Sequence, residues 1–177
     1  FASIILNVSA DHMDRYANLQ DYAHAKQRIY NGDGNLVVNL DDEFAQTLLP
    51  PTLESHRKVL CYSVVHEADY SLCFNQSDQF KSLCIHDEPV LSLAELKMPG
   101  LHNASNALAA LALGELLGLD QTVMITVLQK FTGLPYRMQF VAEHKASRWY
   151  NDSKGTNVGA TCAAVQGLEG KTVLIAG

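Results

Sequence analysis

The fold class is decided by residues 4–40, which read IILNVSADHMDRYANLQDYAHAKQRIYNGDGNLVVNL. Two short apolar runs, Ile4–Val8 and Leu36–Leu40, are typical of buried parallel strands. Between them, Leu19–Tyr30 carries apolar residues at close to a helical period, and Gly32-Asp33-Gly34 provides a turn after it. A strand, a helix and a second strand in this order predict a right-handed crossover in a parallel sheet, so the fold class is α/β.

The chain beyond residue 40 divides at a predicted hinge, Thr132–Pro135. Before the hinge we expect a short helix, an antiparallel β subregion of four segments and two further helices, at 42–49, 59–64, 70–74, 80–86, 90–93, 104–117 and 121–130. After it we expect a hairpin of 139–143 and 147–150, a helix over 158–167 and a strand over 172–175. We therefore predict a three-layer, parallel-sheet domain over residues 1–132 and the truncated start of a Rossmann-like domain over 133–177.

Composition places the chain among folded proteins and excludes several other classes. Hydrophobic residues make up 47% of the 177 residues and charged residues 18%, which excludes intrinsic disorder for the chain as a whole. The net charge of -6 argues against broad nucleic-acid binding. The longest apolar stretch, Ala107–Leu119, is interrupted by Gly114-Glu115 and is too short to span a bilayer. The sequence opens with Phe1 and stops after an apolar run, which indicates a piece of a longer protein.

The four cysteines are Cys61, Cys73, Cys84 and Cys162, and they form no CxxC pair or zinc-finger spacing. We expect all four to be reduced thiols, as is usual in a cytosolic protein. The lack of a basic-then-apolar leader at the start of the sequence agrees with that expectation.

Two candidate sites lie in the first predicted crossover. Asp11-His12-Met13-Asp14 directly follows a strand, and ligands of open α/β sheets bind beyond the carboxyl ends of strands. This group could hold Mg²⁺, bind a carboxylate or relay protons, or it could be a solvated loop with a structural histidine. Lys26 has small alanines beside it on the following helix, so it could point into a cleft or simply into water.

Two further candidates lie near the predicted hinge. Asn103 and Asn106 are about one helical turn apart, with Asn103 as the expected N-cap, so they could read the edge of a purine base or serve as caps only. Arg137 could clamp a phosphate in a bidentate manner. The segment Asn151–Asn157 leads from a strand into a helix N-terminus, where Asp152 could accept from ribose hydroxyls; an ordinary polar loop is the alternative.

Five segments, taken in order, resemble the Mur ligases, which are ATP-dependent amide-forming enzymes of peptidoglycan synthesis. They are Leu6–Tyr16, Tyr22–Lys26, His102–Ala110, Gly133–Arg137 and Asn151–Asn157. The first three resemble the family in general. The last, Asn-Asp-Ser-Lys-Gly-Thr-Asn, is the discriminating one, because it is similar to the branch of the family that adds D-glutamate.

The resemblance implies a cytoplasmic, monomeric enzyme with neither a nucleic-acid nor a membrane partner. With ATP and Mg²⁺ it would join D-glutamate to UDP-N-acetylmuramoyl-L-alanine through an acyl-phosphate. Residues 1–132 would be the later part of its central ATPase domain, and 133–177 the first part of its C-terminal domain. The chain contains no GxxxxGK[ST] phosphate loop, so this piece alone is expected to be inactive. Two alternatives stay open: a folylpolyglutamate synthetase-like ligase, and an inactive nucleotide-binding fragment.

The resemblance also implies the catalytic set, which is Lys26, His12 and Lys154. His12 would bind metal and substrate, and Lys26 would be N-carboxylated so that its carbamate oxygens face Mg²⁺. Lys154 and Thr156 would lie near the acyl-phosphate and the incoming D-glutamate. Gly155 departs from the alanine expected there, which would loosen the entry into the next helix.

The same resemblance implies how ATP is bound. Asn103 and Asn106 match residues that contact adenine. Arg137 matches a residue that contacts phosphate, and Asp152 matches one that contacts ribose. The nucleotide would therefore lie between the start of one helix and the segment beyond the hinge.

Overall fold

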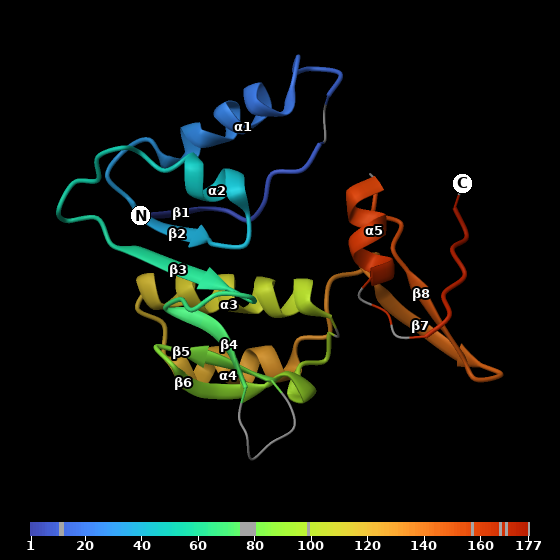
Figure 1. Cartoon of the computed structure of the whole chain (residues 1–177). Helices are drawn as coiled ribbons and strands as arrows, with labels where there is room; N and C mark the ends of the chain where they lie inside the picture. The colour runs from blue at the N-terminus through green and yellow to red at the C-terminus, as the bar shows by residue number, and fades with distance from the viewer. Residues whose placement is uncertain are drawn as a thin grey trace.

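The computed structural model describes residues 1–10, 13–74, 81–98, 100–156, 158–166, 168 and 170–176. Asp11, His12 and Asn157 therefore lie outside the described residues. Within them, the chain forms a six-stranded sheet followed by a separate two-stranded hairpin (Figure 1).

The six-stranded sheet is ordered β1-β2-β3-β4-β5-β6. Its strands are β1 (Ala2–Ile5), β2 (Asn35–Asn39), β3 (Val59–Ser63), β4 (Tyr70–Phe74), β5 (Lys81–Ile85) and β6 (Glu88–Ser92). The pairs β1–β2, β2–β3 and β3–β4 are parallel, whereas β4–β5 and β5–β6 are antiparallel. This confirms the predicted fold class, a parallel α/β sheet with an antiparallel subregion. The expectation that all four segments from 59 to 93 are antiparallel was wrong for the first, because β3 pairs in parallel with both β2 and β4.

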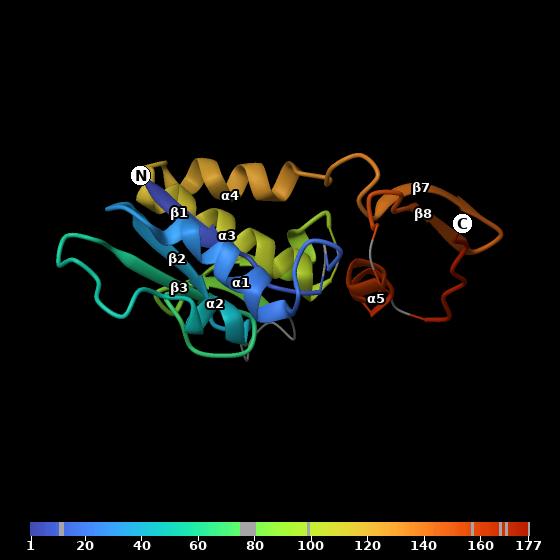
Figure 2. The same cartoon turned by 90° about the horizontal axis from the view of Figure 1, so that it is seen from above.

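Helices cover both faces of the sheet and make three layers. The helices are α1 (Leu19–Gln27), α2 (Glu43–Thr47), α3 (Leu101–Leu116), α4 (Gln121–Lys130) and α5 (Val158–Gln166), with short 3₁₀ turns η1 (Arg28–Tyr30) and η2 (Leu93–Glu95). Figures 1 and 2 show α1 and α2 on one face of the sheet and α3 and α4 on the other. The two pairs of helices therefore shield opposite faces of the sheet.

Two hydrophobic cores lie on the two faces of the sheet. Successive residues of a strand point to opposite faces, so Leu36 packs in the core under α1 and α2, and Val37 packs in the core under α3. α3 is the central helix of the second core, where Leu108 is fully buried and Ala104 and Ala112 allow close approach to the strands. This burial fixes the position of the first turn of α3, which carries Asn103.

The start of α3 differs from the sequence prediction. The helix begins at Leu101, its N-cap is Gly100 at φ 102°, and the cap makes no side-chain hydrogen bond. Asn103 lies inside the first turn, where its backbone N–H donates to the Gly100 carbonyl at 3.1 Å. The expectation that Asn103 is the N-cap was wrong, because the positive φ of Gly100 turns the chain into the helix earlier than the asparagine.

The segment beyond the hinge contains the predicted hairpin but not the predicted last strand. β7 (Gln139–His144) pairs with β8 (Ser147–Asn151), and Lys145 and Ala146 take positive φ angles at the turn. Residues 171–176 belong to no helix or strand, and Val173 and Ile175 are 86% and 78% exposed. The strand expected over 172–175 is therefore absent from this structure, because no described neighbouring strand accepts its hydrogen bonds.

The cysteines also differ from the prediction. Cys73 on β4 and Cys84 on β5 form a disulfide with a Cα–Cα distance of 6.0 Å, whereas Cys61 and Cys162 are free. In the β4–β5 register Cys73 faces Ser82 and Cys84 faces Ser71, which makes the two cysteines diagonal neighbours on one face. The expectation of four reduced thiols was wrong for this pair, because strand register rather than sequence spacing brings the sulfurs together.

No helix in the described part of the chain is long and apolar enough to cross a membrane.

Candidate functional site

The start of α3 and the segment beyond the hinge, which carry most of the described candidate residues, lie at one end of the sheet. Figures 1 and 2 both show that α3 begins at the end where β1, β2 and β3 finish. In both views the β7–β8 hairpin and α5 lie beyond that same end. Parallel α/β sheets bind ligands at this carboxyl end, which agrees with the sequence argument.

The Asp42 side chain connects the segment that follows β1 to the start of α2. Its Oδ2 accepts a hydrogen bond from the Val8 backbone N–H at 3.0 Å, and its Oδ1 accepts from the Ala45 N–H at 2.8 Å. Asn39, which is buried, donates from Nδ2 to the Leu6 carbonyl at 2.8 Å. These bonds hold the chain that leaves β1 against the end of β2, and Val8 precedes His12 by only four residues.

Asp41 makes a matching connection to β3. It accepts a hydrogen bond from the Ser63 hydroxyl and another from the Val64 N–H at 2.7 Å. Burial raises the pKa of neighbouring Tyr62 above its ordinary value; an interaction with Ser105 opposes the rise, and the charges of Asp41 and Asp42 add to it. The phenol is thus held neutral between the sheet and α3.

Sequence reasoning missed these residues, although the signal was present. The segment Asn39–Asp42 follows a predicted strand just as Asp11–Asp14 does. The same argument about the carboxyl ends of strands should have singled out Asp41 and Asp42.

Lys26 is half-buried on α1, and its Nζ lies 4.8 Å from the centre of the Tyr22 ring. A cation over an aromatic face is attracted by the ring quadrupole, so this contact orients the side chain. Tyr22 in turn packs against Tyr16, with ring centroids 5.1 Å apart. Next to Lys26, the Gln27 amide donates to the Leu48 carbonyl at 2.8 Å, which fixes the end of α1 to the end of α2.

The described residues do not by themselves form a site for Mg²⁺. Among them, no group of three His, Cys, Asp or Glu side chains could hold a metal ion. Lys26 as an ammonium would repel a cation, and His12 lies outside the described residues. The predicted metal site thus depends on His12 and on conversion of Lys26 to a carbamate.

The candidate adenine residues share the exposed side of the start of α3. Asn103 is half-buried and Asn106 is exposed, and their spacing of three residues places them on one helical face. Burial lowers the pKa of the adjacent His102, and the negative charge of Asp152 opposes that shift. The carboxylate of Asp152, which follows the hairpin, therefore affects a titratable group at the start of α3.

The candidate phosphate and ribose residues are joined through the backbone. The Lys154 N–H donates to the Tyr136 carbonyl at 3.1 Å, and the Met138 N–H donates to Asp152 Oδ1 at 3.0 Å. Both Arg137 and Lys154 are exposed, whereas Asp152 is half-buried. The structure thus brings Arg137 into one cluster with Asp152 and Lys154.

Two neighbours complete this cluster. Thr156 is exposed and lies just before α5. Gly155 leaves room for the Asp152 carboxylate, because a Cβ added there would lie 2.6 Å from Oδ2. A side chain at this position would turn the Asp152 carboxylate away, an effect that the sequence prediction of a loosened helix entry did not include.

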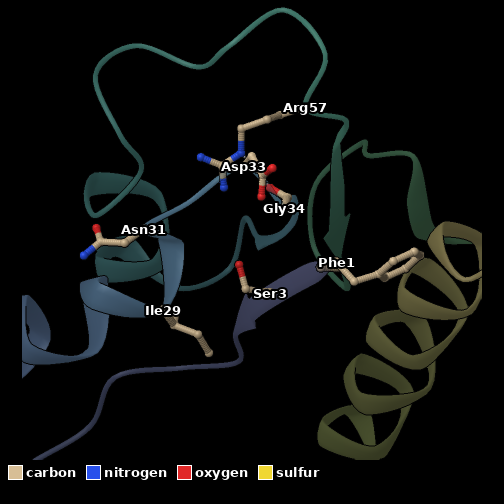
Figure 3. A pocket seen from close by; sticks show the side chains of 8 residues that line it. Phe1, Ser3, Ile29, Asn31, Asp33, Gly34 and Arg57 are labelled. Atoms are coloured by element: carbon tan, nitrogen blue, oxygen red, sulfur yellow. Dashed lines mark hydrogen bonds between the residues drawn. The ribbon is translucent and has the colours of Figure 1, made fainter.

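The hollow shown in Figure 3 lies at the opposite end of the sheet. Its volume is about 260 Å³, and residues around the start of β1 and the turn before β2 line it together with Arg57. The guanidinium of Arg57 is already used, since Nε donates to the Gly34 carbonyl at 2.6 Å and a terminal nitrogen donates to the Tyr30 carbonyl at 3.2 Å. No candidate site residue lines this hollow, so it is not the predicted site.

Comparison with known proteins shows the family of this chain. A family model described as the Mur ligase middle domain matches residues 1–114. The chain belongs to the Mur ligase family. It is 47% identical, over 99% of its own length, to the UDP-N-acetylmuramoylalanine--D-glutamate ligase of Nitrosococcus oceani. It covers 38% of that protein, so the chain spans about two fifths of the length of the curated relatives it matches.

Solved structures share the fold of this chain. A pseudomurein peptide ligase type C from Methanothermus fervidus superposes with a TM-score of 0.76 at 20% identity, over 97% of this chain and 41% of that one. A mutant of L. casei FPGS superposes with a TM-score of 0.70 at 14% identity, over 94% of this chain and 41% of that one. At these identities the likeness is one of fold alone.

Proposed function

We propose that this chain belongs to an ATP-dependent ligase that adds D-glutamate to UDP-N-acetylmuramoyl-L-alanine in peptidoglycan synthesis. The observation that carries the proposal is the 47% identity, over 99% of the chain, to a ligase named for that reaction. The Asn151–Asn157 segment supports the same branch of the family. The enzyme would work as a cytoplasmic monomer, and neither nucleic acid nor a membrane would be a partner.

The two structural units correspond to two proposed domains. Residues 1–132 contain the six-stranded sheet and α1–α4, and would form the later part of the central ATPase domain. Residues 133–177 contain the β7–β8 hairpin and α5, and would form the start of the C-terminal domain. The nucleotide would lie where the carboxyl end of the sheet meets the hairpin.

The chemistry of the four proposed ATP residues fits a nucleotide. Amides such as those of Asn103 and Asn106 both donate and accept, as the edge of adenine requires. The planar guanidinium of Arg137 can give two parallel hydrogen bonds to a phosphate, and the Asp152 carboxylate can accept from ribose hydroxyls. Bound ATP supplies the phosphoryl group that activates the substrate carboxylate as an acyl-phosphate.

Lys154 and Thr156 would act on the substrate side. The exposed Lys154 ammonium can neutralise charge that develops on the acyl-phosphate as the D-glutamate amine attacks its carbonyl carbon. The Thr156 hydroxyl can hydrogen-bond the incoming amino acid. Positioning and charge neutralisation, rather than covalent catalysis, would lower the barrier.

Lys26 and His12 would hold Mg²⁺, provided that Lys26 is N-carboxylated. Carbon dioxide adds to the neutral amine with loss of a proton, so a cation becomes an anionic group with oxygen atoms. Oxygen ligands are what Mg²⁺ prefers. The contact with the Tyr22 ring gives the lysine side chain a defined direction.

The two alternatives predict different outcomes. A folylpolyglutamate synthetase-like ligase is supported only by a fold that L. casei FPGS shares at 14% identity. An inactive nucleotide-binding fragment is supported by the absence of a GxxxxGK[ST] motif from these 177 residues. Neither alternative accounts for the high identity to D-glutamate ligases.

An assay of phosphate release and amide formation by the full-length protein tests the proposal. We expect turnover with ATP, UDP-N-acetylmuramoyl-L-alanine and D-glutamate, and none with a folate and L-glutamate. The 177-residue chain alone should release no phosphate in the same mixture. Turnover of the folate pair would favour the first alternative, and a full-length protein without activity on either pair would favour the second.

A further inference from the structure

We propose that Gln139 and Asp152 are positioning residues that hold the backbone around Arg137 and so direct its guanidinium. This inference rests on the proposed role of Arg137 in binding phosphate. It adds Gln139 to the site and gives Asp152 a task besides its proposed contact with ribose.

The backbone on both sides of Arg137 is strained. Tyr136 has φ 65° and Met138 has φ 46°, both in the left-handed region. Residues with a Cβ are disfavoured there, and neither residue is a glycine, asparagine or aspartate, which adopt this region more readily. Such conformations persist only where the surroundings impose them, and they concentrate at functional sites.

The surroundings do impose this conformation, through hydrogen bonds to both strained residues. The Tyr136 N–H donates to Gln139 Oε1 at 3.0 Å, and the Met138 N–H donates to Asp152 Oδ1 at 3.0 Å. The Tyr136 carbonyl accepts from the Lys154 N–H at 3.1 Å. Each strained residue is therefore held by a side-chain acceptor, and Tyr136 is held on its carbonyl side as well.

Both acceptors are fixed by the hairpin. Gln139 is the first residue of β7, and Asp152 directly follows the last residue of β8, Asn151. Gln139 and Asn151 are register partners, so the two acceptors stand at the same end of one two-stranded sheet. We call the two acceptors, Gln139 and Asp152, the clamp. The clamp belongs to the hairpin and would move with it as one body.

Arg137 lies between the two residues that the clamp holds, and its side chain is available to a ligand. Arg137 is exposed and forms no ion pair within the described residues. A bidentate contact to phosphate requires the planar guanidinium to approach in one orientation. Fixing the backbone beforehand reduces the ordering that binding must otherwise impose, which is how preorganisation raises affinity.

The first experiment removes the Gln139 acceptor. In the full-length protein, Gln139→Met removes the acceptor of the Tyr136 N–H, whereas Gln139→Glu keeps an acceptor there. Gln121→Met is the matched control, because it makes the same change at an exposed position on α4. We expect Gln139→Met to weaken ADP binding by about 3- to 10-fold in calorimetry, as the loss of one hydrogen bond implies. The KM for ATP should rise in parallel with little change in kcat, and Gln139→Glu and Gln121→Met should stay within about 2-fold of wild type.

A double-mutant cycle shows whether Gln139 acts through Arg137. If it does, adding Gln139→Met to Arg137→Ala causes no further loss of ADP affinity. If the losses of ADP affinity in the two single variants multiply in the double variant, or if Gln139→Met binds ADP like wild type, the inference is overturned while the proposed function stays intact. Unchanged ADP affinity in Arg137→Ala would instead overturn the phosphate role on which both rest. Hydrogen exchange supplies a readout apart from binding: the Tyr136 amide should exchange faster in Gln139→Met while the β7–β8 amides keep their protection.

Discussion

Replacing Asp42 by alanine should destabilise the fold by more than the loss of a helix cap. The carboxylate has partners in two different elements: Oδ1 accepts from the Ala45 N–H at 2.8 Å, and Oδ2 accepts from the Val8 N–H at 3.0 Å. The first bond caps α2, and the second holds the segment that leaves β1. Asp42→Ala loses both bonds, whereas Asp42→Asn keeps an oxygen for the cap and presents an N–H donor to the Val8 N–H.

The two losses have different magnitudes. Removing an aspartate N-cap costs about 1 kcal/mol. Val8 as a residue is only 7% exposed. Leaving its backbone N–H without an acceptor therefore lowers the free energy of unfolding by roughly 1–3 kcal/mol. Because Asp42 is half-buried, water replaces part of what is lost, and we expect a total of about 2–3 kcal/mol for Asp42→Ala. For a chain of this length that is a fall in Tm of roughly 4–12 °C.

Urea unfolding followed by circular dichroism measures this loss, and Asp120→Ala is the matched control. Asp120 caps α4 by accepting from the Val123 N–H at 3.0 Å, so its replacement should cost about 1 kcal/mol. Asp42→Asn should fall between Asp42→Ala and wild type. Equal losses in Asp42→Ala and Asp120→Ala would show that the bond to Val8 contributes nothing, and would refute the reasoning.

Three further predictions concern the site, the pH dependence of stability and the disulfide. In the full-length protein Lys26→Ala should abolish ligation and regain part of it with added short carboxylic acids; full activity without them would make the lysine structural only. Burial and the hydrogen bond to Glu115 raise the pKa of Tyr70, so its contribution to stability is present below about pH 10 and lost at higher pH. Tyr70→Phe should therefore flatten the alkaline limb of a stability–pH curve, and an unchanged limb would contradict this. The Cys73 disulfide closes a loop with a sequence separation of 11, so dithiothreitol or Cys73→Ser should lower stability by about 2–3 kcal/mol while Cys162→Ser has no effect.

The fold was predictable where local patterns coincide with tertiary structure. The apolar runs at Ile4 and Leu36 predicted β1 and β2, because a strand buried on both faces needs apolar residues at successive positions. The bounds of the first strand differ from the prediction, since β1 ends at Ile5 rather than at Val8. The run ending at Ile175 has the same pattern but forms no strand here, since a strand also needs a neighbour to accept its hydrogen bonds. The bond between Cys73 and Cys84 could not be predicted, because it depends on the β4–β5 register.

The candidate site was predictable in its residue types but not in its supports. Motif resemblance named Arg137 and Asp152, and the structure clusters them through the backbone at Tyr136 and Met138. Nothing in the identity of Tyr136 or Met138 signals a left-handed conformation, since the residues that usually indicate it are glycine and asparagine. The clamp could be found only once the hydrogen bonds of the hairpin were known.

The candidate nucleotide site consists of two halves that are each rigid for a different reason. Asn103 is held by a helix whose buried face includes Leu108, whereas Arg137 is held by a clamp that lies wholly within residues after the hinge. The charge of Asp152 reaches His102 from one half to the other and opposes the lowering of the pKa of that histidine by burial. A nucleotide that contacts both Asn103 and Arg137 would therefore have to span the two halves and hold them at one separation.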